Sequence, residues 1–305
     1  MNPYLFIVGS PRSGTTLLQR LLDCHPQLAI TPEGRVSKKL LRKLAANPRF
    51  AELGVKVKKK HFRDDKEGGR AWYAGFVSTL FDLYGKKQGK PLVGDKTPGY
   101  AREIVTLHAL WPAAKFVHLI RDGRDVALSI LNWERARNWK PGEGAARFHT
   151  WAEDSLSTAA LWWEWHVRLA REAADPLGPA LYHEVRYEAL VDRPADECRA
   201  ICDFLGVPPD DALVPKYEEQ ARSNCGRPDK HPWMLITRGL RDWQSQMAPA
   251  EVERFEAAAG RLIEQLGYRR AFPRIRPEAQ EQAALTRDWF VQDAHAQGYP
   301  VPADW

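Results

Sequence analysis

Short, continuously apolar runs recur along the first half of the chain, each followed by glycine or polar residues and then by a segment with helical spacing. The runs cover residues 5–8, 28–30, 91–94 and 115–120. Strands that are buried on both faces read as such runs, and their alternation with helices is typical of a parallel sheet. The pattern therefore predicts an α/β fold in which a parallel β-sheet is flanked by helices.

The turn after the first predicted strand, Gly9–Thr16, combines two glycines with small polar residues. Gly9 and Gly14 let the backbone turn sharply and approach a ligand closely. The N–H groups of such a loop and of the helix that follows face one point, where their partial positive charge suits a phosphate. We therefore expect a P-loop-type sheet that carries helical insertions. An ordinary strand-to-helix turn made of small residues is the alternative interpretation.

The same loop departs from the Walker A pattern G-x-x-x-x-G-K-[ST] at one position. Thr15 stands where that pattern requires Lys, and the cation of the loop is Arg12. The missing Lys argues against phosphoryl transfer from ATP, because that Lys acts on the β- and γ-phosphates. A P-loop kinase or NTPase and a non-catalytic nucleotide-binding protein remain the alternative functions.

Charged side chains follow the other predicted strands where each strand ends. Glu33 follows the second strand, Lys96 follows the third, and Arg121 and Ser129 bracket the turn and first helical turns after the fourth. In open α/β folds ligands bind at this edge of the sheet. Lys96 can therefore reach a ligand held by the phosphate loop, and Arg121 and Ser129 can bind one phosphate together. The plainer interpretations are a solvated loop carboxylate or a helix cap for Glu33, and a turn capped by Asp122 for Arg121.

Aspartate ends the third predicted strand, since the apolar run at 91–94 leads directly into Asp95. Apolar residues that end in Asp also mimic a Walker B strand. This signal is weak on its own, because any buried strand can end in a polar turn.

Composition limits the classes of ligand and partner that the chain is expected to bind. The 305 residues are 44% hydrophobic, which is enough for one large domain, and the net charge of +6 suits anionic ligands without indicating nucleic acid. The four cysteines have no C-x-x-C spacing, so neither a zinc site nor a disulfide framework is indicated, and no metal is expected. Cys198 and Cys202 lie one helical turn apart and are expected in the core.

No signal-like leader precedes the first strand, and no apolar run is long enough to span a bilayer. A cytoplasmic protein that does not bind a membrane is therefore expected.

Most of the chain, residues 1–270, is predicted to form one domain, with residues 36–90 as a helical insertion or lid. The basic run Lys56–Lys60 in that insertion is either a solvated face or a docking site for an acidic acceptor. Residues 145–172 form a long predicted helical segment whose tryptophans are expected mostly in the core. The C-terminal extension, residues 271–305, is expected to pack back, to dimerise or to extend over the acceptor site.

Two motifs in the right order resemble the sulfotransferases that use 3′-phosphoadenosine 5′-phosphosulfate (PAPS). Gly9–Thr16 is similar to their 5′-phosphosulfate loop, and Lys115–Ser129 is similar to their 3′-phosphate motif. Val185–Leu190, Phe204–Gly206 and Arg238–Trp243 resemble further family segments. Three features look closer to the tyrosylprotein sulfotransferases and their bacterial relatives than to the cytosolic small-molecule enzymes: the loop sequence 11–17, residues 23–26 and Glu33.

The resemblance implies a PAPS-dependent sulfotransferase that acts on a hydroxyl acceptor, which would be a peptide tyrosine, a sugar or a small natural product. It implies Glu33 as the general base, Lys96 as the residue that stabilises the leaving group, and Arg12 as a further catalytic cation. A His base is the alternative to Glu33. The donor-binding residues that it implies are Arg12, Ser13, Gly14, Thr15, Thr16, Arg121, Ser129, Tyr187, Arg238 and Gly239. Where the tyrosylprotein branch has a second Arg one turn after Ser129, this chain has Trp133. The identity of the acceptor and the oligomeric state, a homodimer included, stay open.

Overall fold

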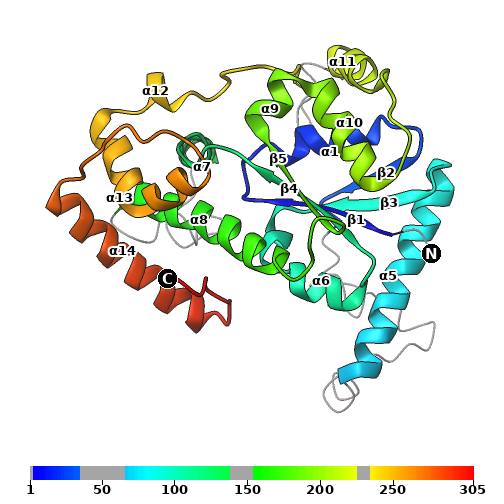
Figure 1. Cartoon of the computed structure of the whole chain (residues 1–305), viewed down its shortest axis with the longest axis horizontal. Helices are drawn as coiled ribbons and strands as arrows, with labels where there is room; N and C mark the ends of the chain where they lie inside the picture. The colour runs from blue at the N-terminus through cyan, green and yellow to red at the C-terminus, as the bar shows by residue number, and fades with distance from the viewer. Residues whose placement is uncertain (1–2, 35–65, 138–153, 225–233) are drawn as a thin grey trace.

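A sheet of five parallel strands runs through the middle of the computed structural model, which describes residues 3–34, 66–137, 154–224 and 234–305 (Figure 1). The strand order is β2-β3-β1-β4-β5. The strands are β1 (Leu5–Gly9), β2 (Leu28–Pro32), β3 (Leu92–Lys96), β4 (Lys115–Ile120) and β5 (Tyr182–Arg186). The parallel sheet and its four apolar strands are therefore confirmed, and β5 completes the sheet at the edge beside β4.

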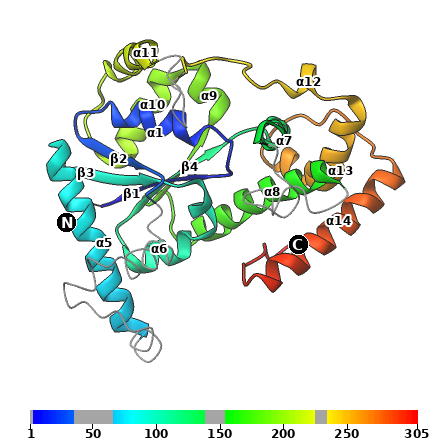
Figure 2. The same ribbon diagram turned by 180° about the vertical axis from the view of Figure 1, so that it is seen from behind.

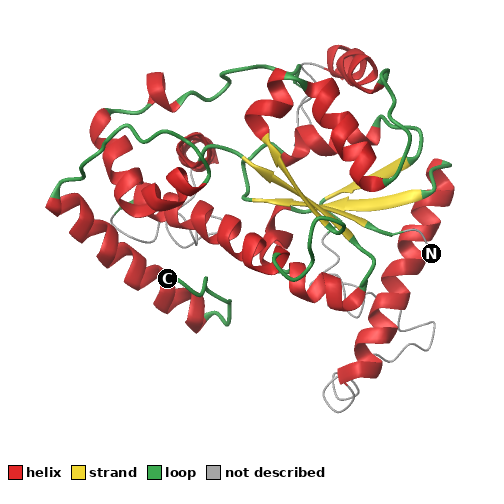
Figure 3. Ribbon diagram, viewed as in Figure 1, coloured by secondary structure: helices red, strands yellow, loops and turns green. Residues whose placement is uncertain are grey.

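Helices cover both faces of the sheet (Figures 1 and 3). The helices on one face are α1 (Thr15–Asp23), α9 (Tyr187–Asp192), α10 (Pro194–Leu205) and α11 (Leu213–Asn224). The elements on the other face are α5 (Lys66–Gln88), the 3₁₀ helix η1 (Pro98–Arg102), α6 (Ile104–Leu110) and one end of α8 (Ser155–Ala174). Each layer buries its own apolar cluster against the strands, and Cys198 and Cys202 lie in the first of these clusters, as expected.

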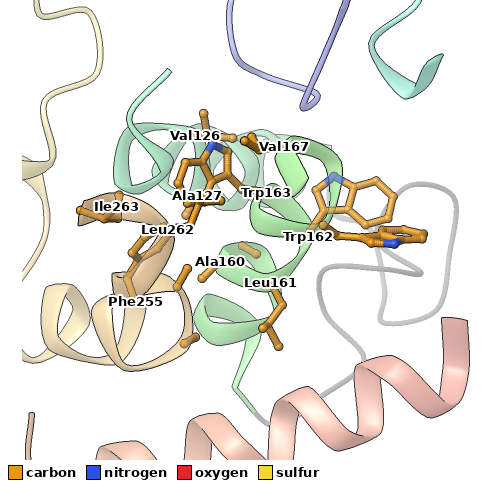
Figure 4. Close-up of a cluster of buried hydrophobic side chains, with 14 of the residues drawn as sticks. Val126, Ala127, Ala160, Leu161, Trp162, Trp163, Val167, Phe255, Leu262 and Ile263 are labelled. Atoms are coloured by element: carbon orange, nitrogen blue, oxygen red, sulfur yellow. The ribbon is translucent and has the colours of Figure 1, made fainter. Parts of the chain in front are cut away.

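A second, all-helical lobe lies beside the sheet (Figure 2). It consists of α7 (Gly123–Arg137), α8, the short α12 (Trp243–Gln246), α13 (Pro249–Gln265) and α14 (Pro277–Ala296). Its core is built around Trp163 of α8 and Phe255 of α13, whose ring centroids lie 5.9 Å apart (Figure 4). Trp162, Trp163 and Trp165 are all buried, so the expectation that the α8 tryptophans belong to the core is confirmed.

The C-terminal extension packs back onto this lobe. Phe290 of α14 is fully buried, and its ring centroid lies 5.5 Å from that of Trp165. The Trp165 indole N–H donates to the carbonyl oxygen of Pro300 at 2.8 Å. Of the fates considered for the extension, packing onto the chain's own α8 is the one that the described residues show.

The predicted insertion is described only from residue 66 onward, where α5 packs its buried Val77 and Phe81 against the sheet. Residues 36–65, with the basic run Lys56–Lys60, lie outside the described residues. Trp139 and Trp151 in the helical segment, Cys225 and the side chain of Trp133 lie outside them as well.

A buried charge network joins the sheet to the helical lobe. Arg124, at the start of α7 and 2% exposed, pairs with Asp122 at 2.7 Å and with Glu256 of α13 at 2.8 Å. Asp122 also accepts the backbone N–H of Arg124 at 2.9 Å, so it caps the turn after β4. The network fixes the direction in which α7 leaves the sheet, and α7 carries Ser129.

Candidate active site

The loop between β1 and α1 has the backbone geometry of a phosphate loop. Gly14 caps α1 with φ at 97°, and a Cβ built on it would lie 2.5 Å from the ring of Tyr187. Arg12 also has a positive φ, of 75°, which is uncommon outside glycine and turns the chain sharply at this point. Ser13 is 1% exposed, and its hydroxyl has no hydrogen-bond partner among the described residues. The loop therefore holds a buried donor next to a helix N-terminus.

Lys96, Glu33 and Thr16 come together at the carboxyl edge of the sheet. The Lys96 ammonium lies 3.1 Å from Glu33 Oε1 and donates to Thr16 Oγ1 at 3.2 Å. The Lys96 side chain is 2% exposed, whereas that of Glu33 is 30% exposed. The lysine is thus fixed at the start of α1 beside the phosphate loop, and the carboxylate beside it is partly open to solvent.

Glu33 is held in a constrained turn directly after β2. Its φ of 51° lies in the left-handed region, and its backbone N–H donates to the carbonyl oxygen of Lys96 at 2.7 Å. The side chain follows from this backbone: β2 pairs with β3 so that Pro32 stands opposite Lys96, and the next residue turns back over the end of β3.

Arg12 and Ser129 connect the two predicted phosphate motifs. Arg12 Nε donates to Ser129 Oγ at 3.2 Å, although 117 residues separate them in the chain. Ser129 is 7% exposed and lies on α7, two turns after the end of β4. One arginine of the first loop therefore reaches the hydroxyl assigned to the second motif.

Arg121, directly after β4, is almost fully buried. Its Nη2 donates to Asp125 Oδ2 at 3.0 Å and to the carbonyl oxygen of Arg241 at 3.2 Å, and its guanidinium carbon lies 4.3 Å from the centroid of the Tyr187 ring. Its Nε is buried without a hydrogen-bond partner among the described residues. A buried, unused guanidinium N–H is the feature that an anionic ligand would satisfy.

Tyr187 lies at the start of α9 and packs between Gly14 and Arg121. It is 9% exposed, and burial raises the pKa of its phenol. In this arrangement its ring supports the phosphate loop. Contact with an adenine stays a prediction.

Arg238 points elsewhere in this structure. Its guanidinium is exposed and forms an ion pair with Asp192 at 2.7 Å. Gly239 has a positive φ of 64°. The same segment reaches the site through Arg241, whose carbonyl oxygen accepts from Arg121. The donor-binding role of Arg238 and Gly239 therefore stays a prediction.

Asp125 is a site residue that the sequence reasoning did not single out. It accepts from Arg121 through Oδ2 and from the backbone N–H of Trp243 through Oδ1, at 3.0 and 2.9 Å. Burial raises the pKa of this carboxyl, and the Arg121 guanidinium opposes that rise. Its position in the first turn of α7, four residues after Arg121, was the available signal.

The residues at this edge fit an anionic nucleotide with two separate phosphate positions. Arg12 and Lys96 stand at the phosphate loop, and Arg121 stands after β4, next to Ser129's helix. Two buried donors in this region, the Ser13 hydroxyl and Arg121 Nε, have no protein partner among the described residues. The fold and the site together define an α/β protein with a P-loop-type turn and a Lys–Glu ion pair beside that turn.

Comparison with known proteins identifies the family. A model of the sulfotransferase family matches residues 3–211, so the chain belongs to that family. Protein-tyrosine sulfotransferase A of Caenorhabditis elegans is 27% identical over 223 residues, which are 70% of this chain and 52% of that protein. Nodulation protein NoeE of Sinorhizobium fredii is 28% identical, over 89% of this chain and 67% of that protein. The resemblance to sulfotransferases, and to the tyrosylprotein branch and bacterial members, is confirmed.

Solved structures agree with the fold. The sulfotransferase domain of the Synechococcus PCC 7002 olefin synthase superposes with a TM-score of 0.53 at 27% identity and covers 88% of this chain and 95% of that domain. The chain spans about half the length of the curated relatives from C. elegans and Drosophila melanogaster. None of the described helices has an apolar stretch of the length needed to cross a bilayer.

Proposed function

We propose that this chain transfers the sulfuryl group of PAPS to a hydroxyl acceptor, with Glu33 as the general base and Lys96 stabilising the leaving group. The observation that carries the proposal is the contact of Lys96 with both Glu33 and Thr16 at the end of the phosphate loop. A cation there would stabilise the negative charge that develops on the departing phosphate oxygen. A carboxylate beside it would accept the proton that the acceptor hydroxyl loses.

The chain offers two groups of residues to the donor. Arg12, Ser13, Gly14, Thr15 and Thr16 form the loop and helix start that would hold the 5′-phosphosulfate. Arg121 and Ser129 would hold the 3′-phosphate, Tyr187 would pack against the adenine, and Arg238 with Gly239 would close over the donor.

Bound PAPS would supply an activated sulfuryl group for an in-line displacement. Glu33 accepts the hydroxyl proton of the acceptor on its Oε atoms, which requires the carboxylate to be ionised. Lys96 holds its ammonium near Thr16 and neutralises charge on the bridging oxygen. Arg12 adds a second positive charge at the loop. Fixed orientation of the two reactants supplies a large part of such a rate enhancement.

The acceptor class is a separate question. The named relatives include protein-tyrosine sulfotransferases, so a peptide tyrosine belongs in the acceptor panel together with sugars and small natural products. A cytoplasmic location, a homodimer and independence from nucleic acid, membrane and metal stay predictions.

Glu33→Gln tests the assignment of the base. The amide keeps the size of the side chain and loses the basic oxygen, so we expect kcat to fall by about 10²–10⁴-fold. Affinity for 3′-phosphoadenosine 5′-phosphate (PAP), the donor product, should stay within about twofold, since the proposed partner of Glu33 is the acceptor hydroxyl and not the nucleotide. Transfer of label from ³⁵S-PAPS and calorimetric binding of PAP measure the two quantities.

Glu219→Gln is the matched control, because Glu219 is exposed on α11, away from the sheet edge that carries Glu33. Unchanged transfer in Glu33→Gln, or an equal loss of PAP affinity, would remove Glu33 from the role of base.

A further inference from the structure

Asp95 is a fully buried carboxylate at the end of β3, next to Lys96 in the chain. Successive side chains of a strand point to opposite faces, so Asp95 and Lys96 leave the strand on different sides. Among the described residues no lysine or arginine forms an ion pair with Asp95. A buried carboxylate without a cation needs hydrogen-bond donors, because its desolvation is costly.

Three donors meet this carboxylate. The Thr31 hydroxyl donates to Oδ1 at 2.5 Å, and the backbone N–H of Gly34 donates to the same oxygen at 2.7 Å. The Thr97 hydroxyl donates to Oδ2 at 3.0 Å. Both oxygens are therefore engaged by the protein, which distinguishes Asp95 from a Walker B aspartate that keeps its carboxylate for a metal-bound water.

Two of the donors flank Glu33. Thr31 precedes the turn and Gly34 ends it. Asp95 Oδ1 therefore accepts hydrogen bonds from both ends of the segment in which Glu33 adopts its left-handed φ of 51°. A non-glycine residue is disfavoured in that conformation unless its surroundings hold it there. A Cβ built on Gly34 would lie 2.8 Å from Asp95 Oδ1, so the carboxylate and the glycine fit as a pair.

These contacts of Asp95 affect the placement of Glu33 relative to Lys96. The turn that Asp95 fastens is the one that donates the Glu33 N–H to Lys96 O and sets Glu33 Oε1 at 3.1 Å from the Lys96 ammonium. Without Asp95, Thr31 and Gly34 would lose the acceptor that they share. The Glu33 carboxylate between them would then lose its fixed orientation.

We propose that Asp95 is a positioning residue for this reaction: it holds the Thr31–Gly34 turn so that Glu33 faces Lys96, and it acts on catalysis through Glu33. The proposal rests on the proposed role of Glu33 as the general base. It requires no metal and no direct contact between Asp95 and either substrate.

A double-mutant cycle in the full chain tests this role. Asp95→Asn keeps the volume and weakens the acceptor, so kcat should fall by about 10–100-fold at saturating acceptor, since small displacements of a reacting group have effects of that order. In the Glu33→Gln background the same substitution should lower the residual transfer less than twofold. Asp95 affects the rate only by orienting the Glu33 carboxylate, and that carboxylate is absent in this background. Binding of PAP should stay within about twofold throughout.

Two further variants keep the test decisive. Thr31→Val removes one of the two Oδ1 donors and should lower kcat in the same non-additive way, even if Asp95→Asn fails to fold. Asp203→Asn, at an exposed position on α10, is the matched control and should change nothing.

The outcomes separate the two assignments. A full and independent loss from Asp95→Asn, or from Thr31→Val, in the Glu33→Gln background overturns the positioning role and leaves the base assignment intact. A parallel loss of PAP affinity also overturns it, because the effect would then come from the donor site. Full activity of Glu33→Gln alone overturns the base assignment, and the positioning role with it.

Discussion

Lys96 and Glu33 meet because of a strand register. They lie 63 residues apart in the chain, but β2 pairs with β3 so that Pro32 stands opposite Lys96. The sequence placed both residues at the carboxyl edge of the sheet. It could not show that β2 and β3 are neighbours, because the long segment between them leaves the strand order open. The contacts of Asp95 with Thr31 and Gly34 were hidden for the same reason, since they join the end of β3 to the end of β2 and the turn after it.

At the residue scale, the 3′-phosphate assignment gives a selective prediction. Arg121→Ala and Ser129→Ala should each weaken PAP binding by about 10–100-fold, as expected for the loss of hydrogen bonds to a charged group. Binding of ADP, which has no 3′-phosphate, should change by less than about threefold in the same variants. Calorimetry with both nucleotides checks this, and an unchanged PAP affinity in either variant would remove that residue from the site.

At the element scale, β4 and β5 share a polar network that the apolar pattern concealed. His118 is fully buried in β4, and its Nδ1 lies 2.5 Å from the Tyr182 hydroxyl, which donates to Glu184 at 3.1 Å. Arg171 of α8 closes the network with two hydrogen bonds to Glu184, each 2.8 Å long. The run at 115–120 predicted the strand correctly, but one buried histidine within it gave no signal of its partners, which come from β5 and α8.

This network predicts how stability depends on pH. Burial lowers the pKa of His118 from 6.5 to about 4, so the unfolded chain binds this proton more readily than the folded chain does. The contribution to the free energy of unfolding is complete above pH 6.5 and is lost as the pH falls toward 4. Between pH 7.5 and pH 5 the free energy of unfolding should therefore fall by about 2 kcal/mol because of His118.

Urea unfolding at the two pH values checks this. His118→Asn should remove that part of the pH dependence, whatever its effect on stability at pH 7.5. An equal drop on acidification in wild type and His118→Asn would contradict a neutral, buried His118.

At the scale of the whole molecule, the chain beyond residue 270 is part of the folded core. Trp165 contacts Phe290 and the Pro300 carbonyl, and Arg287 of α14 pairs with the buried Glu164 at 2.8 Å. The sequence left the fate of this extension open because α14 is polar along most of its length and buries few side chains. Its docking depends on tryptophans more than 100 residues earlier, which no local pattern reveals.

Phe290→Ala tests this integration. Removing a fully buried phenylalanine should lower the free energy of unfolding by about 3–5 kcal/mol. PAP affinity of the folded fraction should not change, because Phe290 packs against Trp165, whereas Arg121 is contacted by Trp163 and by the Arg241 carbonyl oxygen. Leu285→Ala on the same helix is the control, since Leu285 is 60% exposed. A cost below about 1 kcal/mol for Phe290→Ala would mean that α14 contributes little to the core.

The most direct measurement is calorimetric binding of PAP and of ADP to the wild-type chain in a chelator, without added metal. The proposed roles of Arg12, Arg121 and Ser129 at two phosphate positions predict a strong preference for PAP, by about 100-fold or more, since the 3′-phosphate that ADP lacks would accept several charge-assisted hydrogen bonds. Equal affinity, a preference for ADP, or binding only when Mg²⁺ is restored would show that the Arg12 loop serves phosphoryl chemistry and would contradict a PAPS-dependent sulfotransferase.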